Sequence, residues 1–203
     1  MNKVSYILGA SCAENLLRSG VVSIDFDDFL TGIKDIFQGN ELRIPVEEGN
    51  QIITEYFENL KKEQDELARK ESEDNKKKGE AYLKVNEKKD GVEVTSSGLQ
   101  YKVITKADGE VKHPDAHSRV KCHYEGRLID GRIFDSSYMR NEPAVFGLDQ
   151  VIPGWTEGLQ LMGIGEKYEF TIPADLAYGD VGIPGRIPGN SVLIFTVELL
   201  EIL

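Results

Sequence analysis

The sequence is poor in the side chains from which metal sites and most covalent catalysts are built. Only two cysteines and three histidines occur among its 203 residues. Cys12 and Cys122 lie far apart, with no CxxC pair and no cluster of histidines, which argues against bound zinc. The motifs GxSxG and HExxH and a glycine-rich phosphate loop are missing as well. We therefore expect no metal and no cofactor, and conventional catalytic groups are scarce.

Basic residues and long apolar runs are also in short supply. The 24 Lys and Arg residues are outnumbered by 35 Asp and Glu residues, so the net charge is -11. Such a chain repels a phosphate backbone, and we expect no nucleic-acid partner. No stretch approaches the ~20 apolar residues that a membrane span requires. Apolar residues nevertheless make up 40% of the chain, enough for a real core.

The N-terminal residues MNKVSYILGASC raise the question of a short lipoprotein signal, because a lysine and an apolar run precede Cys12. Gly9 stands three residues before this cysteine, where such a signal would have leucine. Val4, Ile7, Leu8 and Cys12 also share one helical face. We favour a mature helix and a cytoplasmic location. The alternative is the periplasm or cell envelope, if the native N-terminus carries a signal.

The first 45 residues contain two short amphipathic helical patterns, over 4–18 and after Asp25. Asp25 is a good helix cap, and Gly39 is a good helix end. The apolar residues of the second pattern follow at helical spacing: Phe26, Phe29, Leu30, Ile33 and Phe37. Two short helices bury too little surface to be stable alone. They need a partner, either the rest of the chain or a second copy.

A longer helical pattern follows Pro45. An apolar stripe runs to Leu67, and residues 69–80, RKESEDNKKKGE, then contain no apolar side chain. Mixed charges at separations of three and four residues support an exposed helix there. A helix from about 46 to 86 would be roughly 60 Å long at ~1.5 Å per residue. A flexible charged linker is the alternative.

The second half changes character, from helical periods to strand-like runs between Gly and Pro turns. The runs are 99–105, 118–128, 168–173 and 191–203, with one short helical stretch at 155–162. Asp130–Gly131 is a strong hairpin signal. Alternation along 118–128 buries Cys122 and turns His123 outward, as a surface or satisfied residue and not a base. We expect an antiparallel α+β domain.

Four sequence blocks of the second half carry a resemblance to a known family. They are HYEGRLIDGRIFDSS at 123–137, VIPGWTEGLQLM at 151–162, LAYGDVGIPGRIP at 176–188 and LIFTVELLEI at 193–202. Their order and spacing resemble the signature blocks of FKBP-type peptidyl-prolyl cis/trans isomerases. The first half, through SYxxG and KGExYL, resembles the dimerisation region and connecting helix of the Mip-like dimeric branch in bacteria. The two resemblances cover essentially the whole chain.

The resemblance implies a domain organisation and a pocket. Residues 1–88 would form an all-helical dimerisation region with a long linker helix at about 46–86. Residues 89–203 would form an antiparallel half-barrel sheet wrapped on one short helix. The catalytic residues that it implies are Tyr124, Phe134, Asp135, Tyr178 and Phe195. The substrate-binding residues that it implies are Arg140, Phe146, Val151, Ile152, Trp155, Ile183 and Ile187.

The implied activity is rotation of X–Pro bonds in folding proteins, by desolvation in an aromatic pocket and stabilisation of the twisted amide. Asp135 could interact with the displaced carbonyl carbon or orient Tyr124 and Arg140. The expected partners are proline-containing polypeptides, a second copy of the chain bound through the N-terminal helices, and macrolide inhibitors. Ala144 and Arg186 depart from residues common in eukaryotic members, which affects macrolide affinity and substrate preference. A chaperone that holds unfolded clients between two arms, or a structural module with a degenerate pocket, is the alternative.

Overall fold

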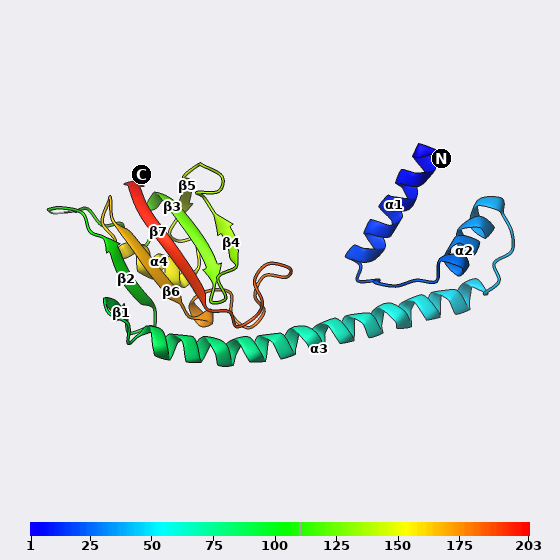
Figure 1. Cartoon of the computed structure of the whole chain (residues 1–203), viewed down its shortest axis with the longest axis horizontal. Helices are drawn as coiled ribbons and strands as arrows, with labels where there is room; N and C mark the ends of the chain where they lie inside the picture. The colour runs from blue at the N-terminus through cyan, green and yellow to red at the C-terminus, as the bar shows by residue number, and fades with distance from the viewer. Residues whose placement is uncertain (110) are drawn as a thin grey trace. The chain divides into compact units, whose positions relative to one another are not determined.

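The computed structural model describes residues 1–109 and 111–203, which divide into two compact units. The first, Met1–Asp65, contains two short helices and the beginning of a long one. The second, Glu66–Leu203, contains the end of the long helix and all the strands (Figure 1). Among the described residues, no helix combines the length and the apolar character needed to cross a membrane.

The first unit contains the two short helices that the sequence predicts, α1 (Lys3–Arg18) and α2 (Phe26–Gln38). Side-chain oxygens of Asn2 and Asp25 cap them by accepting hydrogen bonds from the second and third backbone N–H groups of each helix. Gly39 ends α2 in the left-handed conformation, with φ 69°. The predicted cap and end of α2 are thereby confirmed. Neither helix contains a buried residue.

The long helix α3 runs without interruption from Val46 to Asn86, which confirms the helical prediction over the flexible linker. Its buried residues are Ser72, Gly79 and Asn86, all in the second unit. The division between the two compact units falls inside α3, and the domain boundary expected at 88–89 stays a prediction. The last turns of α3 make polar contacts with the sheet. Asn86 Nδ2 donates to Gln100 Oε1 at 2.9 Å, for example.

The second unit is an antiparallel sheet that curls around one short helix, α4 (Figure 1). Its strands follow the order β1-β2-β6-β7-β3-β4, and β5 pairs with β3. The bounds are β1 Val92–Val94, β2 Gln100–Thr105, β3 Arg119–Leu128, β4 Ile133–Ser136, β5 Ala144–Gly147, α4 Pro153–Gln160, β6 Lys167–Ile172, the 3-10 turn η1 Ala174–Leu176, and β7 Leu193–Ile202. The α+β half-barrel expected from the resemblance is confirmed.

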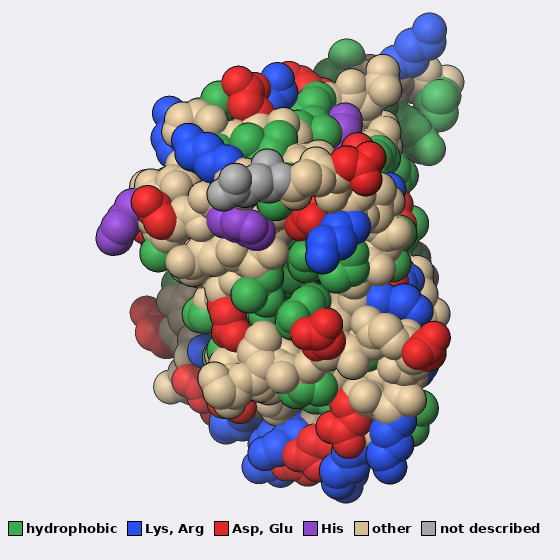
Figure 2. Space-filling view, turned by 90° about the vertical axis from the view of Figure 1, so that its left-hand side faces the viewer, with side chains coloured by type: hydrophobic (Ala, Val, Ile, Leu, Met, Phe, Trp, Pro, Cys, Tyr) green, Lys and Arg blue, Asp and Glu red, His purple; other side chains and the backbone are tan. Residues whose placement is uncertain are grey.

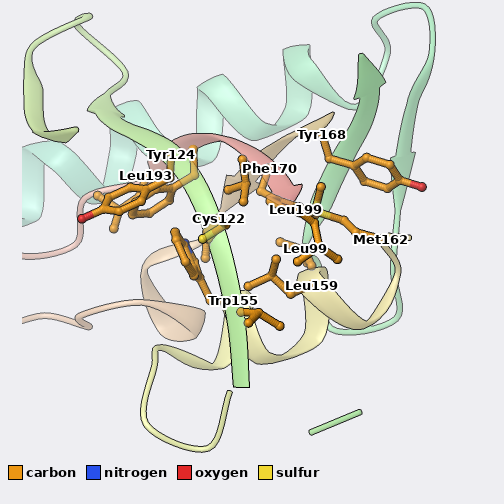
Figure 3. Close-up of a cluster of buried hydrophobic side chains, with 14 of the residues drawn as sticks. Leu99, Cys122, Tyr124, Trp155, Leu159, Met162, Tyr168, Phe170, Leu193 and Leu199 are labelled. Atoms are coloured by element: carbon orange, nitrogen blue, oxygen red, sulfur yellow. The ribbon is translucent and has the colours of Figure 1, made fainter. Parts of the chain in front are cut away.

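Residues of β3 alternate between the core and the surface, as the sequence predicts. Val120, Cys122, Tyr124 and Leu128 are buried, and they pack with side chains from α4, β6 and β7 (Figure 3). Burial raises the pKa of the Cys122 thiol to about 12, so this cysteine stays protonated and serves as a small core residue.

The hairpin predicted at Asp130–Gly131 is confirmed, and it joins β3 to β4. The Gly131 N–H donates to the Leu128 carbonyl at 3.0 Å, and its φ of 89° favours glycine. The short strand β5 was not expected from the sequence. It is only four residues long, too few for an alternating pattern to be distinguished from a loop.

Charged side chains of both signs cover much of one face of the molecule (Figure 2). On the face shown in Figure 2, basic and acidic residues lie interspersed, and hydrophobic side chains show only in small groups between them. Ion pairs at helical spacing along α3, such as Lys78–Asp74 at 2.7 Å, belong to this exposed charge pattern. Each such pair adds little stability in water.

Close packing of α4 on the sheet depends on glycine. A Cβ atom added at Gly158 would lie 2.7 Å from Cε1 of the buried Phe170 ring, closer than real Cβ contacts come. We expect Gly158→Ala to lower the free energy of unfolding by about 1–3 kcal/mol, because the core is overpacked. As a control, Gly49→Ala on α3 meets no heavy atom within 4 Å and should not destabilise. Thermal unfolding of both variants would check this, and equal midpoints would contradict it.

Candidate active site

A cavity of about 390 Å³ opens beside α4 in the second unit. Its walls come from β3, β4, β5 and β7, from α4 and the turn before it, and from the loop between η1 and β7. It is lined by Tyr124, Phe134, Asp135, Phe146, Gln150, Val151, Ile152, Trp155, Tyr178, Ile183, Arg186, Ile187 and Phe195. The structure thus brings together every residue that the sequence analysis assigned to the pocket, except Arg140.

Trp155, the only tryptophan of the chain, is the centre of the aromatic part of this cavity. Its ring is approached nearly edge-on by Tyr124, Phe146 and Phe195, with centroids 5.3, 5.3 and 5.2 Å away. Such edge-to-face contacts are the favourable arrangement for aromatic rings. Trp155 is 4% exposed, and its Nε1 has no hydrogen-bond partner among the described residues. Among the described residues, packing contacts hold the indole.

Asp135 belongs to a closed polar network at the border of the cavity. Its Oδ2 accepts a hydrogen bond from the Tyr124 hydroxyl at 2.6 Å, and its Oδ1 accepts one from Arg140 Nη1 at 2.5 Å. Arg140 Nη2 also donates to the Tyr124 oxygen at 2.9 Å. Arg140 thus lies on the side of the carboxylate away from the cavity, which explains why it does not line the cavity. It can affect the site only through its hydrogen bonds to Asp135 and Tyr124.

This network determines the charge state of Asp135. Burial acts to raise the pKa of the carboxyl, but the hydrogen bonds from Tyr124 and Arg140 and the guanidinium charge outweigh it, so the pKa is lowered. Burial and the carboxylate together raise the pKa of the Tyr124 hydroxyl, despite an opposing effect of Arg140. At neutral pH the site therefore holds an ionised carboxylate beside a neutral phenol.

Tyr178 and Arg186 belong to the loop that closes one side of the cavity. Burial raises the pKa of Tyr178, and the nearby charge of Arg186 acts the other way. Tyr178 therefore stays protonated at neutral pH and can donate a hydrogen bond. Arg186 Nη2 donates to the Phe134 carbonyl at 2.9 Å and links this loop to β4.

Two lining residues, Gln150 and Arg186, were not among the predicted site residues. Arg186 had been noted only as a departure from an apolar residue common in eukaryotic members. Gln150 directly precedes the predicted Val151, and this adjacency is the only sequence signal for it. His123, in contrast, makes a 3.0 Å contact from Nδ1 to Ser137 Oγ and stacks on Tyr138. It is a satisfied residue, as expected.

An antiparallel half-barrel closed on a short helix, with an aromatic cavity above a buried tryptophan, defines the class of FKBP-type prolyl isomerases. The family model for the FKBP-type peptidyl-prolyl cis-trans isomerase matches residues 110–200. The model for the domain amino terminal to this isomerase matches residues 1–103. The chain belongs to the FKBP-type peptidyl-prolyl cis-trans isomerases, and it carries the amino-terminal domain of that family.

Relatives match along nearly the whole chain. The FKBP-type 22 kDa peptidyl-prolyl cis-trans isomerase of Escherichia coli K12 is 41% identical over 201 residues, which are 99% of this chain and 95% of the relative. The isomerase FkpA of Aeromonas hydrophila is 45% identical over 96% of this chain and 72% of its own length. The crystal structure of Escherichia coli FkpA has a TM-score of 0.73 and 37% identity, and the match covers 98% and 95% of the two chains. The predicted family and its isomerase activity are confirmed.

The pKa directions predict how activity depends on pH. The lowered pKa of Asp135 means that its charged network is intact above the ordinary carboxyl value of about 3.9 and is lost as pH falls through the lower folded value. The raised pKa values of Tyr124 and Tyr178 keep both hydroxyls protonated to above about pH 10. We therefore expect kcat/KM on proline peptides to be flat from about pH 5 to about pH 9.

The measurement is a pH profile of peptide isomerisation, with circular dichroism recorded at each pH to confirm that the protein is folded. The Asp135→Asn variant lacks the titrating carboxyl and should be slower. Its kcat/KM should fall at acid pH only where circular dichroism shows that the protein unfolds. An acid decline centred near pH 6 in the unaltered protein would contradict the assignment.

Proposed function

We propose that the cavity beside α4 holds the proline of an X–Pro bond and that isomerisation proceeds there without covalent catalysis. Resonance keeps the amide planar, and rotation costs ~18–20 kcal/mol. Charge separation across the C–N bond is lost when the amide twists. A dry aromatic cavity therefore disfavours the planar, polar amide relative to the twisted one. The observation that carries this proposal is the buried Trp155 ring, enclosed edge-on by three other aromatic rings.

Each lining group has a role in this proposal. Trp155 lies under the proline ring as the floor of the cavity. Tyr124, Phe134 and Phe195 exclude water, and the T-shaped contact of Phe134 with Phe195, at 5.4 Å between centroids, supports this shared wall. Tyr178 donates a hydrogen bond to a substrate carbonyl, and its raised pKa keeps the hydroxyl protonated for this role. A hundredfold acceleration requires the activation free energy to fall by only ~2.7 kcal/mol.

Asp135 had two possible roles, and its hydrogen bonds support the second. Both carboxylate oxygens already accept charge-assisted or short hydrogen bonds, from Tyr124 and Arg140. An electrostatic contact with the substrate would have to compete with these partners. We infer that Asp135 orients the Tyr124 ring against Trp155 and thereby shapes the cavity.

These roles predict distinct effects of substitution. Tyr178→Phe should lower kcat/KM on proline tetrapeptides by about three- to tenfold, the worth of one hydrogen bond, without changing stability. Asp135→Ala should lower kcat/KM with the fold intact. Trp155→Ala should be worse, and it should also cost about 3–5 kcal/mol of stability. Tyr101→Phe is a matched control, since this β2 tyrosine binds Glu93 and does not line the cavity.

Isomerisation can be followed by a protease-free spectroscopic assay, and folding by circular dichroism. Full activity of Asp135→Ala on several peptides would refute the role given to Asp135. A correctly folded unaltered protein without isomerase activity would refute the proposed site as a whole.

We further propose that the chain forms a homodimer through α1 and α2. These helices bury no residue, and large apolar side chains on them face outward: Ile7 is 63% exposed, Phe26 70% and Phe37 88%. Large apolar side chains exposed on both helices favour an interaction site there. A symmetric pair of identical chains is the commonest way to cover it. The match of residues 1–103 to the amino-terminal family domain supports this region as a separate functional part.

A dimer would give the enzyme two pockets for unfolded, proline-containing polypeptides. Once one pocket is engaged, the linked second pocket acts at a raised effective concentration. The chaperone alternative differs in that holding the client would not need the cavity. Macrolide binding and a cytoplasmic location, both expected from the sequence, stay predictions. Ala144, whose small side chain packs against the core at the start of β5, would lower the wall that a macrolide meets.

The dimer and its effect on clients can be tested together. The unaltered chain should sediment as a dimer at micromolar concentration, and the double variant Ile7→Asp, Phe37→Asp should be a monomer. Peptide turnover should be unchanged, because the pocket is untouched. Catalysis of proline-limited refolding of a protein should fall by about an order of magnitude. Leu67→Asp on α3, 66% exposed, is a control with an added charge outside α1 and α2.

A monomeric unaltered chain would contradict the dimer, and equal refolding catalysis by monomer and dimer would contradict the role of paired pockets. Suppression of aggregation by the Trp155 or Asp135 variants, without isomerisation, would favour the chaperone alternative.

A further inference from the structure

One buried polar side chain of α3 binds both ends of the loop that closes the cavity. Ser72 Oγ donates to the Asp180 carbonyl at 3.1 Å and accepts from Asn190 Nδ2 at 2.8 Å. One turn further along the helix, Asn75 Nδ2 donates to the Gly189 carbonyl at 3.2 Å. Ser72 is 9% exposed, and Asn75 is half-buried. The sequence predicted this polar face of the helix to be solvated. Part of it instead forms hydrogen bonds with the loop.

The loop has little freedom of its own where α3 meets it. A Cβ atom at Gly189 would lie 1.9 Å from the Asp180 oxygen and 2.7 Å from Ser72 Oγ, so the two chain segments and the helix are in direct contact. The Asn190 N–H donates to the Gly179 carbonyl at 2.8 Å and closes the loop at its base. Asn190 itself has φ 55°, a left-handed conformation that asparagine tolerates. The contacts of α3 thus lie at the base of the loop.

The same loop supplies one wall of the cavity. Tyr178, Ile183, Arg186 and Ile187 all line it, and Ile183 and Ile187 pair across the loop through backbone hydrogen bonds of 2.7 and 2.9 Å. A displacement at the base of the loop would therefore move the groups that face a substrate. Ser72 and Asn75 do not line the cavity.

We propose that Ser72 and Asn75 of α3 are positioning residues for prolyl isomerisation: they hold the loop of residues 178–190 in the geometry that binds substrate. The inference rests on the cavity being the substrate site, as proposed above. It makes the last turns of α3 part of the isomerase and not only a connection to the amino-terminal domain. Because this wall contributes to binding, loss of the contacts raises KM more than it lowers kcat.

The test compares full-length variants that lose similar hydrogen bonds in different places. Ser72→Ala and Asn75→Ala remove contacts with the loop. Asn86→Ala is the matched control: Asn86 is a 5% exposed residue of α3, and its amide donates to Gln100 and Thr171, neither of which lines the cavity. Ser72→Ala and Asn86→Ala should both reduce stability, because each leaves buried polar partners unpaired.

Only the loop-side variants should affect the cavity. We expect Ser72→Ala to raise KM for a proline tetrapeptide by about three- to tenfold, the worth of one or two hydrogen bonds, with kcat changed less than about twofold. Asn75→Ala should shift KM in the same direction by less. Asn86→Ala should leave KM unchanged.

A second readout does not depend on activity. Trp155 is the only tryptophan and lies in the cavity, so acrylamide quenching of its fluorescence reports on access to the site. Quenching should rise in Ser72→Ala and Asn75→Ala but not in Asn86→Ala. This readout separates the inference from the proposed function. If quenching rises in the loop-side variants while the unaltered protein has no isomerase activity, only the proposed function is refuted.

The proposal is overturned if both loop-side variants keep the KM and the quenching of the unaltered protein. It is equally overturned if Asn86→Ala changes KM as much as Ser72→Ala at matched stability, because the effect would then be general. If Ser72→Ala does not fold, the half-buried Asn75 provides the decisive variant.

Discussion

The edge-on packing of aromatic rings around Trp155 is the arrangement on which the rest of the candidate active site depends. Three strands deliver Tyr124, Phe146 and Phe195 to one indole, so the cavity exists only when the sheet has curled around α4. Edge-to-face rings stand upright against their neighbour and leave room above it, whereas stacked rings would fill that space. The protein can therefore keep an apolar cavity of about 390 Å³ beside an otherwise close-packed core.

A polar network borders the cavity because an apolar wall alone would not fix the position of Tyr124. The short hydrogen bonds to Asp135, completed by Arg140, hold the phenol end of a ring whose other contacts are apolar. The carboxylate is only partly exposed, and its burial is compensated by two donors. In the proposed mechanism charge thus serves the geometry of the site, and the rotation of the amide uses neither a nucleophile nor a metal.

The sequence was sufficient for those parts of the fold that local chemistry determines. The Asp25 cap, the Gly39 end, the continuous α3 and the alternation through Cys122 could all be read from residue type and spacing. The site residues came from the resemblance, because residues far apart in the sequence meet only through sheet pairing, as Gly126 of β3 does with Phe195 of β7. Gln150 escaped prediction for a different reason. It lies outside the strands, and its place at the cavity depends on how the chain turns before α4.

The charged part of α3 shows most clearly where local reasoning stops. RKESEDNKKKGE contains no apolar side chain, and by composition it reads as solvent-exposed on every face. Yet Ser72 and Gly79 within it are buried, since a small hydroxyl and a missing side chain let the loop base and Val192 approach the helix backbone. An apolar stripe is only one way to dock a helix. Small residues and buried hydrogen bonds are another, and they leave almost no trace in hydrophobic periodicity. A helix attached in this way keeps its polar surface toward water while its position at the loop is specified by hydrogen-bond geometry.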